Sequence, residues 1–288
     1  MGWPGAGPTS QVMDSETPAT DDAGMTVTRP AVGVMLRDWR RRRRLSQLEL
    51  SIRADISTRH LSFLETGRSS PSREMVLQLA DRLDLALRER NRLLLAAGFA
   101  PVYPENALDA PPMTVIRAAI RQVLDGHEPY PAVVVDRGWN LVAANESLSV
   151  LTDLVAPELL MPPANVLRAS LHPAGLAPHI VNLGEWRWHL LHRLGRQVEF
   201  SGDPDLADLE EELRGYPGGA AHAVGPMTND IVVPVRLRRD GRVLNLFTTV
   251  ATFGTPLDVT LSELSIESFY PADEETAREL RSRRSASR

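Results

Sequence analysis

The feature that most constrains the fold is a series of helix signals between residues 32 and 98. Apolar side chains recur at helical spacing from Val32 onward, on the face opposite a run of five arginines. Ser46 and Glu49 then have the spacing of a capping box, in which each side chain accepts a hydrogen bond from the other residue's backbone N–H. The pattern predicts one helix that ends at the arginine run and a second that starts at Ser46.

Three further helices are expected before residue 98. Ser57 can cap a helix over residues 58–66, and Gly67 can end it, because glycine readily adopts the left-handed conformation that follows a helix. Pro71 can begin a fourth helix, since its missing N–H is not needed in the first turn. A fifth helix is expected at about residues 87–97. Five short helices joined by tight turns predict a compact all-α bundle.

Positive charge is concentrated in this bundle. All 32 basic residues of the chain are arginines, and residues 32–98 hold 14 of them against eight acidic residues, a net charge of +6. Because the whole chain carries −5, the remainder carries −11. A basic module attached to an acidic one indicates that the first module binds nucleic acid. The chain has no cysteine, which excludes disulfides, thiol catalysis and cysteine-ligated zinc and agrees with a cytoplasmic location.

Residues 45–72 contain the most specific motif. It reads Leu45-Ser46-Gln47 and Glu49-Leu50, then Ser57-Thr58-Arg59-His60-Leu61-Ser62, and then Leu64-Glu65, Gly67-Arg68 and Pro71-Ser72. The motif resembles the phage-repressor-like (Xre) helix-turn-helix family, and the resemblance covers residues 32–83. It implies a sequence-specific bacterial DNA-binding regulator. It also implies that Arg40 pairs with Glu65 and braces the first helix against the third.

The exposed residues of the third helix are the candidates for reading bases. A helix in the major groove reads bases with its N-terminal residues, while the preceding helix rests on phosphates. Arg59 can donate two hydrogen bonds to guanine O6 and N7. The candidate DNA-binding residues are Gln47, Ser57, Thr58, Arg59, Ser62 and Arg68, with Arg41 and Arg43 of the arginine run. The arginine run can equally be a solvated face, and His60 and Phe63 can either touch DNA or support the bundle.

Three segments lie outside the two expected domains. Residues 1–30 combine Pro, Gly, Ser and Thr with acidic residues, so we expect a disordered tail rather than a signal peptide, with Met25 as an alternative translation start. Four prolines interrupt residues 99–113, which we expect to link the bundle to a second domain at residues 114–275. Residues 276–288 are expected to form a basic C-terminal tail.

The second domain mixes helix and strand signals. Asp240-Gly241 between two apolar runs is a strong hairpin signal, and Thr260 and Glu263 have capping-box spacing. The expected elements are helices at 114–126, 145–156, 183–198 and 204–214, strands at 132–136, 139–143, 231–238 and 243–252, and a final helix from about residue 273. Two hairpins among helices predict an α+β domain with one antiparallel sheet.

Several motifs of this domain resemble the MmyB-like regulators. They are Pro129-Tyr130-Pro131-Ala132-Val133-Val134-Val135-Asp136, Trp139-Asn140-Leu141, Asn165-Val166-Leu167-Arg168, Leu171-His172-Pro173, Phe253-Gly254-Thr255-Pro256 and Phe269 with Pro271-Ala272-Asp273. In that family a PAS-like ligand-binding domain follows the helix-turn-helix. The resemblance therefore implies a PAS-like domain that binds a small lipophilic ligand, with a fatty acid as the leading candidate.

Five residues are candidates for the ligand pocket: Trp139, Asn140, Arg168, His172 and Trp186. A carboxylate ligand would need an arginine fork or an equivalent donor, which Arg168 can supply. The alternative is that Trp139 and Trp186 are core aromatics and that Arg168 holds a loop. His189 and His192 lie three residues apart on one expected helix, but two histidines without a third ligand are weak evidence, so we expect no metal site.

The patterns together favour a ligand-responsive transcription factor that binds a palindromic operator in double-stranded DNA as a homodimer. The alternative keeps the DNA-binding module and makes the second domain a ligand-free dimerisation or protein-interaction module. The sequence has neither a glycine-rich phosphate loop nor a Gly-x-Ser-x-Gly elbow, so we expect neither an enzyme nor a cofactor. No run approaches the roughly 18 apolar residues that a membrane span needs, so no membrane partner is expected.

Overall fold

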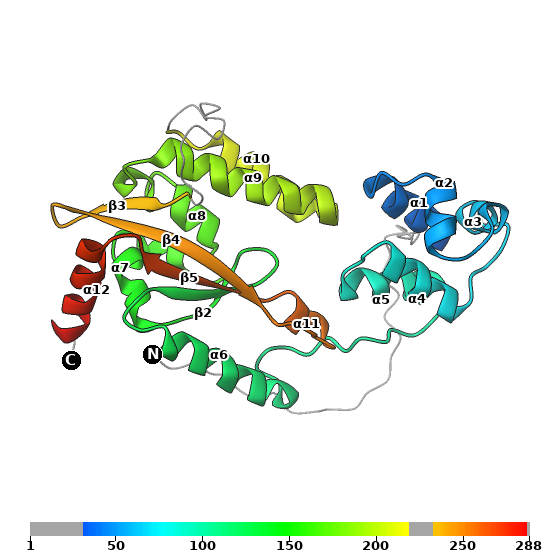
Figure 1. Ribbon diagram of the computed structural model, residues 1–288, viewed down its shortest axis with the longest axis horizontal. Helices are drawn as coiled ribbons and strands as arrows, with labels where there is room; N and C mark the ends of the chain where they lie inside the picture. Colours follow the sequence, from blue (N-terminus) through cyan, green and yellow to red (C-terminus); the bar gives the residue numbers. More distant parts are fainter. Residues whose placement is uncertain (1–30, 219–232, 287–288) are drawn as a thin grey trace, which may run out of the picture.

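The computed structural model describes residues 31–218 and 233–286, and the expected disordered tail at residues 1–30 lies outside these ranges. A helical bundle is followed by an α+β domain (Figure 1). The bundle consists of α1 (Val32–Arg42), α2 (Gln47–Arg53), α3 (Thr58–Glu65), α4 (Arg73–Arg82) and α5 (Leu87–Ala96). These five short helices confirm the predicted all-α bundle.

Local hydrogen bonds determine where these helices begin and end. The predicted capping box is present at α2, where the Ser46 Oγ accepts from the Glu49 N–H and the Glu49 carboxylate accepts from the Ser46 N–H. Gly67 follows α3 with a left-handed φ of +72°. The prediction that α4 starts at Pro71 is wrong, because the Ser72 hydroxyl caps the helix by accepting a hydrogen bond from a first-turn N–H.

The bundle has its own apolar core. Leu36 of α1, Leu50 of α2, and Leu61 and Leu64 of α3 are fully buried. Gly33 brings α1 against the C-terminal end of α3, since a Cβ atom at this position would lie 2.2 Å from the carbonyl oxygen of Leu64. The close approach of the two backbones therefore positions α3 on the rest of the bundle.

The second domain is built on a five-stranded antiparallel sheet with the order β2-β1-β5-β4-β3. The strands are β1 (Ala132–Val135), β2 (Leu141–Ala144), β3 (Val235–Arg239), β4 (Arg242–Thr252) and β5 (Ser265–Pro271). The α-helices are α6 (Thr114–Gly126), α7 (Ser149–Thr152), α8 (Val166–Leu171), α9 (Leu183–Ser201), α10 (Pro204–Gly215), α11 (Val259–Ser262) and α12 (Glu274–Ala286). The short 3-10 turns are η1 (Pro111–Met113), η2 (Glu146–Leu148), η3 (Pro157–Leu160) and η4 (Ala177–His179). This arrangement confirms the predicted α+β, PAS-like architecture.

Helices cover both faces of the sheet. Helix α6 lies on one face, and α8 and α9 lie on the other (Figure 1). The side chains of β1 alternate accordingly: Val134 packs with Ile120 of α6, whereas Val133 belongs to the core that includes Leu190 of α9. Burial on both faces explains why β1 is a continuous apolar run. The core on the α9 side is the larger of the two and surrounds the cavity described below.

Sequence reasoning does not find β5, the middle strand of the sheet. Its residues include Glu267 and Ser268 and end in proline, so they lack the β-branched apolar run that marks β1. β5 pairs with β1 along residues 132–135 and with β4 along residues 246–252. Pairing on both edges, rather than local propensity, makes this segment a strand.

The linker is tied to both domains. The Asn91 side chain of α5 accepts from the backbone N–H of Tyr103 and donates to its carbonyl oxygen. Three residues on, the backbone and side chain of Asn106 both donate to the carboxylate of Asp258 in the second domain. The linker therefore follows a defined path between the domains.

Asp258 also begins α11. Its carboxylate accepts a hydrogen bond from the backbone N–H of Leu261, which makes Asp258 the N-cap. The predicted capping box of Thr260 and Glu263 is therefore wrong. Asp258 is the earlier side chain that can reach the first turn, and the Glu263 carboxylate is bound elsewhere, by Arg88 of α5.

The C-terminal end of the chain packs on the sheet as α12. Thr276, Ala277 and Leu280 of this helix are buried, so the segment expected as a basic tail is folded as far as Ala286. Arg278 and Arg281 of this helix are exposed, and Arg283 and Arg284 are half-buried. No helix in the two described ranges is long and apolar enough to cross a membrane.

Candidate DNA-binding surface and ligand cavity

Helix α3 carries the expected base-reading residues at its exposed N-terminal end. Arg59 is exposed, and Thr58 and Ser62 are half-buried. The Thr58 Oγ1 lies 3.0 Å from the Oγ of Ser51 on α2, a hydrogen bond that joins the two helices of the motif. Ser57 is also exposed, and its hydroxyl serves as the N-cap of α3. The structure thus brings these four residues together on one surface.

The guanidinium groups of two arginines contact the ring of Phe63, for which the sequence allowed either a DNA contact or a supporting role in the bundle. The guanidinium of Arg59 lies 5.3 Å from the ring centroid, and that of Arg68 lies 5.9 Å from it. A cation–π contact orients a guanidinium without using its N–H donors. Phe63 therefore holds Arg59 and Arg68 on one surface with their N–H groups available to an acceptor, and His60 is exposed beside them.

A buried ion pair braces this surface. The Arg40 Nε and Nη2 donate to the two Glu65 carboxylate oxygens at 2.6 and 2.8 Å, as the resemblance implied. Gln47 donates to the same carboxylate at 2.8 Å, and its amide can still donate a second hydrogen bond outward. Burial alone would raise the pKa of Glu65, but the hydrogen bonds from Arg40 and Gln47 outweigh it and leave this pKa below its usual value.

Arg41 and Arg43 of the arginine run lie in different environments. Arg41 is exposed, as a phosphate contact requires. The Arg43 guanidinium instead donates to the carbonyl oxygens of Leu83, Asp84 and Phe200, and it lies 3.7 Å from the centroid of the Phe200 ring. Burial in this contact lowers the pKa of Arg43. These carbonyls engage three of its five N–H donors, which places Arg43 to join α1 to α9.

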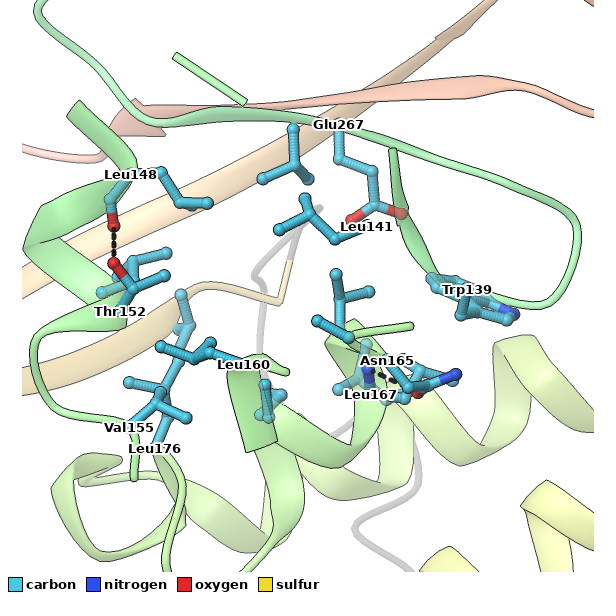
Figure 2. A pocket seen from close by; sticks show the side chains of 18 of the residues that line it. Trp139, Leu141, Leu148, Thr152, Val155, Leu160, Asn165, Leu167, Leu176 and Glu267 are labelled. Carbon is cyan, nitrogen blue, oxygen red and sulfur yellow. Dashed lines mark hydrogen bonds between the residues drawn. The ribbon is translucent and has the colours of Figure 1, made fainter. Parts of the chain in front are cut away.

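A cavity of about 100 Å³ lies between the sheet and helices α7, α8 and α9 (Figure 2). Trp139 and Trp186, two of the expected ligand residues, line it, and both also belong to the buried core. Their indole N–H groups donate to Gln197 at 2.8 Å and to Ser170 at 2.9 Å. The other lining residues are mostly aliphatic, among them Leu141, Leu148, Val155, Leu167 and Leu176.

The other three expected ligand residues do not line the cavity. Arg168 forms a fork with the carboxylate of Glu212 on α10, which lowers the pKa of Glu212. The His172 ring packs edge-on against Tyr216, with centroids 5.0 Å apart. The side-chain amide of Asn140 donates a hydrogen bond to the carboxylate of Asp136 in the same turn. The hypothesis that Arg168 receives a ligand carboxylate is therefore corrected, because Glu212 already fills the fork and both residues lie outside the cavity.

Among the described residues, Glu267 is the charged one that lines the cavity, and no local sequence pattern marks it because β5 itself was not recognised. Its side chain is buried, with 7% of the residue exposed, and projects from the sheet toward the cavity (Figure 2). The Arg193 Nη1 lies 2.6 Å from the Glu267 Oε1, but without the alignment of a hydrogen bond. The same guanidinium lies 4.4 Å from the centroid of the Trp139 ring.

One face of α9 connects the cavity with the bundle. Trp186 and Leu190 line the cavity, Arg193 reaches Glu267, Gln197 accepts from an indole, and Phe200 contacts the bundle. Successive spacings of four, three, four and three residues place these side chains along a single stripe. A shift or rotation of α9 at the cavity would therefore move the contact at its other end.

Ion pairs add to the contact between the domains. Arg88 of α5 forms a fork with Glu263 at 2.7 and 2.9 Å and also reaches Glu105 of the linker. Arg44 pairs with Glu199 at the end of α9. A cleft of about 400 Å³ lies between these contacts, and both Arg88 and Arg193 line it. Arg193 thus stands between the cavity and the cleft.

The two α9 histidines pack against tryptophans. His189 stacks on Trp186 with ring centroids 5.6 Å apart, and His192 stacks on Trp188 at 5.0 Å. Burial lowers the pKa of His189. Across residues 31–218 and 233–286, no three His, Cys, Asp or Glu side chains come together in an arrangement that could hold a metal ion.

Comparison with protein-family models agrees with both halves of this description. Residues 116–282 match the MmyB-like transcription regulator ligand binding domain, which is more than half of the chain. The chain belongs to the MmyB-like transcription regulators. Residues 31–93 match a helix-turn-helix domain, so this MmyB-like regulator is a DNA-binding transcription regulator with a ligand-binding domain.

Solved structures resemble this regulator only distantly. The PAS domain of Bordetella pertussis BvgS is 15% identical, with a TM-score of 0.27, over 60% of this chain and 99% of that one. An RNA-binding light-oxygen-voltage receptor is 16% identical, with a TM-score of 0.24, over 92% of this chain and 64% of that one. No curated protein matches the chain significantly.

Proposed function

We propose that this MmyB-like regulator binds a palindromic operator as a homodimer and that a small lipophilic ligand in the cavity alters its affinity for DNA. One half-site provides little affinity, whereas a two-fold dimer spaces its recognition helices about 34 Å apart. The observation that carries the ligand part of the proposal is the α9 stripe, which runs from the cavity to Arg43 of the bundle. A ligand that binds one position of α9 better than another would shift the domain arrangement.

The cavity lining supports a lipophilic ligand more than a fatty-acid carboxylate. Its walls are aliphatic and aromatic, which suits an apolar tail. The expected arginine partner, Arg168, is occupied by Glu212, and the charged side chain that does line the cavity is the carboxylate of Glu267. We therefore propose a lipophilic ligand and no longer favour a fatty acid.

A ligand-free dimerisation module is the competing function for the second domain. Well-packed interiors have few voids, so an apolar cavity with a buried carboxylate on its wall counts against a purely structural core. The two functions are separated by measuring operator affinity of the full chain with and without a broad set of small lipophilic compounds. Unchanged affinity across the whole set would remove the sensor role and leave the DNA-binding role intact.

Replacing Arg59 with alanine is expected to relax sequence preference at one base pair of each half-site. A bidentate arginine–guanine contact contributes about 1–3 kcal/mol of discrimination. The measurement is competition binding of the variant against operators randomised one position at a time. If the full preference survives in Arg59→Ala, Arg59 does not read a base.

Gln47→Ala is the matched comparison for this experiment. Gln47 lies at the start of α2, where the preceding helix of the motif faces phosphates. We expect the variant to weaken binding to all operator sequences evenly, because a phosphate contact carries no base information. A loss confined to one base position would instead assign base reading to Gln47.

The double replacement Glu199→Ala and Phe200→Ala is expected to abolish the effect of a bound ligand on operator affinity. It removes the ion pair to Arg44 and the ring under Arg43. We expect an effective cavity compound to change operator affinity of the wild-type chain by roughly 5- to 150-fold and that of the variant by less than about twofold. The control is His192→Ala, an exposed residue of α9 that packs against Trp188. A full ligand response in the double variant would rule out this route.

A further inference from the structure

Phe63 is a half-buried aromatic residue that takes no part in the core of the bundle. Its neighbours on α3, Leu61 and Leu64, are fully buried in that core. Across residues 31–98, all of which the structure describes, the Phe63 ring neither belongs to the apolar core nor packs against it. Folding of the bundle therefore does not explain the ring, and its contacts with two arginines are the role that the structure gives it.

Local structure brings both arginines to this ring. Arg59 precedes Phe63 by four residues on α3, so the two side chains lie on the same face of the helix. The chain then turns at Gly67, which has a φ of +72°. After this turn, the Arg68 backbone N–H donates to the Phe63 carbonyl oxygen at 2.9 Å, which places the Arg68 side chain beside the same ring.

Neither guanidinium has a second partner that would orient it. Within residues 31–218 and 233–286, the side chains of Arg59 and Arg68 form no hydrogen bond and no ion pair. Arg40 differs, because the Glu65 carboxylate accepts from its guanidinium at 2.6 and 2.8 Å. A free arginine side chain samples many rotamers, whereas a bidentate contact with a base needs the guanidinium in one plane. The contact with Phe63 restricts the guanidinium and leaves its N–H donors available.

We infer that Phe63 is a positioning residue of the DNA-binding surface, whose ring orients Arg59 for base reading and Arg68 for phosphate contact without itself touching DNA. The inference rests on the proposed function, because it concerns residues proposed to bind the operator. A cation–π contact at an exposed site changes an equilibrium by roughly two- to fivefold. Loss of the ring therefore reduces base discrimination but does not remove it, since Arg59 is still present.

The variant Phe63→Leu of the full chain tests the inference, because leucine stays apolar but has no ring face. We expect discrimination at the base pair that Arg59→Ala identifies to fall by about two- to fivefold. The urea unfolding midpoint should stay close to that of the wild type, since the ring lies outside the core. Phe63→Tyr keeps the ring face and should keep the wild-type discrimination. Competition binding against operators that differ at this base pair measures each value.

Phe99→Leu is the matched control. Phe99 is also a half-buried phenylalanine of the bundle, but its ring packs against the core. We expect the opposite result for this variant, a lower unfolding midpoint with unchanged discrimination by the folded protein.

Salt dependence separates lost orientation from lost charge. Both arginines remain in Phe63→Leu, so the slope of log affinity against log salt concentration should stay close to the wild-type slope. Arg68→Ala, which removes one expected phosphate contact, should instead make the slope shallower by about 0.9.

The double variant Arg59→Ala with Phe63→Leu separates positioning from direct contact. A ring that acts through Arg59 adds no further loss at that base pair once Arg59 is gone. A further loss there would show that the ring touches DNA and would overturn the inference. Full discrimination in Phe63→Leu, or a clearly lower unfolding midpoint, would also overturn it, and all three outcomes leave the proposed function standing. Intact preference in Arg59→Ala alone would remove base reading by Arg59 together with the inference.

Discussion

Replacing Glu65 with alanine is expected to lower the free energy of unfolding of the helical bundle by about 3–5 kcal/mol. Glu65 is 2% exposed, and its carboxylate accepts hydrogen bonds from Arg40 and Gln47. Its removal leaves the Arg40 guanidinium buried without a counter-charge, which costs more than the pair itself contributes. Because Glu65 ends α3, operator binding should fall as the recognition helix loses its brace.

Urea unfolding followed by circular dichroism measures this effect. Glu74→Ala is the matched control, since Glu74 is an exposed glutamate of the same bundle, and we expect its unfolding midpoint to stay close to that of the wild type. The paired replacement Arg40→Met with Glu65→Leu should recover much of the lost stability, because it removes both charges together. An unchanged midpoint for Glu65→Ala would show that the ion pair does not brace the bundle.

The same pair gives the bundle a defined pH dependence. The pKa of Glu65 is lowered in the folded protein, so the carboxylate contributes stability above its unfolded pKa of about 4.3. That contribution is lost as the pH falls through the lower, folded pKa. Acid unfolding of the wild type should therefore show this loss, and the Glu65→Ala variant should lack it.

Replacing Gly33 with alanine is the second large effect we expect, a loss of about 1–3 kcal/mol in the free energy of unfolding of the bundle. The added Cβ atom would lie 2.2 Å from the Leu64 carbonyl oxygen and 3.0 Å from the Glu65 carbonyl carbon, and both are backbone atoms. A flexible side chain could move aside, but here α1 and the end of α3 must separate. The same urea unfolding experiment measures the change.

Gly126→Ala provides a control with the opposite sign. Gly126 is the last residue of α6, and a Cβ atom there would meet no other atom within 4 Å. We expect this variant to stabilise the second domain by about 0.4–1 kcal/mol, because alanine restricts the unfolded chain more than glycine does. If Gly33→Ala were as stable as the wild type, the close approach of α1 and α3 would not be tight in solution.

The helical bundle could be predicted closely from the sequence because its signals are local. The capping box of Ser46 and Glu49 and the glycine after α3 each act within one helix end, so short spacings reveal them. The exposed residues of α3 follow from the same periodicity. The error at the start of α4 is a shift of two residues: Pro71 was expected as the first helical residue, whereas Ser72 caps a helix that begins at Arg73 by accepting from the Met75 N–H.

The ligand cavity could be predicted only in part. Trp139 and Trp186 were identified because large aromatics in a motif indicate either core or pocket, and the structure gives them both roles. Arg168 was expected to bind the ligand because an arginine fork suits a carboxylate, but Glu212, 44 residues away on α10, already fills that fork. Nothing in the local sequence around Arg168 indicates that partner.

The sequence by itself determined the DNA-binding half of this MmyB-like regulator, because helix caps, helical periodicity and excess positive charge are encoded within short segments. Only the tertiary structure decided the ligand-binding half. β5 is a strand because β1 and β4 pair with it, and Glu267 faces the cavity because β5 lies there. The contact of α9 with Arg43 likewise joins residues 157 positions apart. Pairings over such separations depend on the folded arrangement, and a short sequence pattern does not record them.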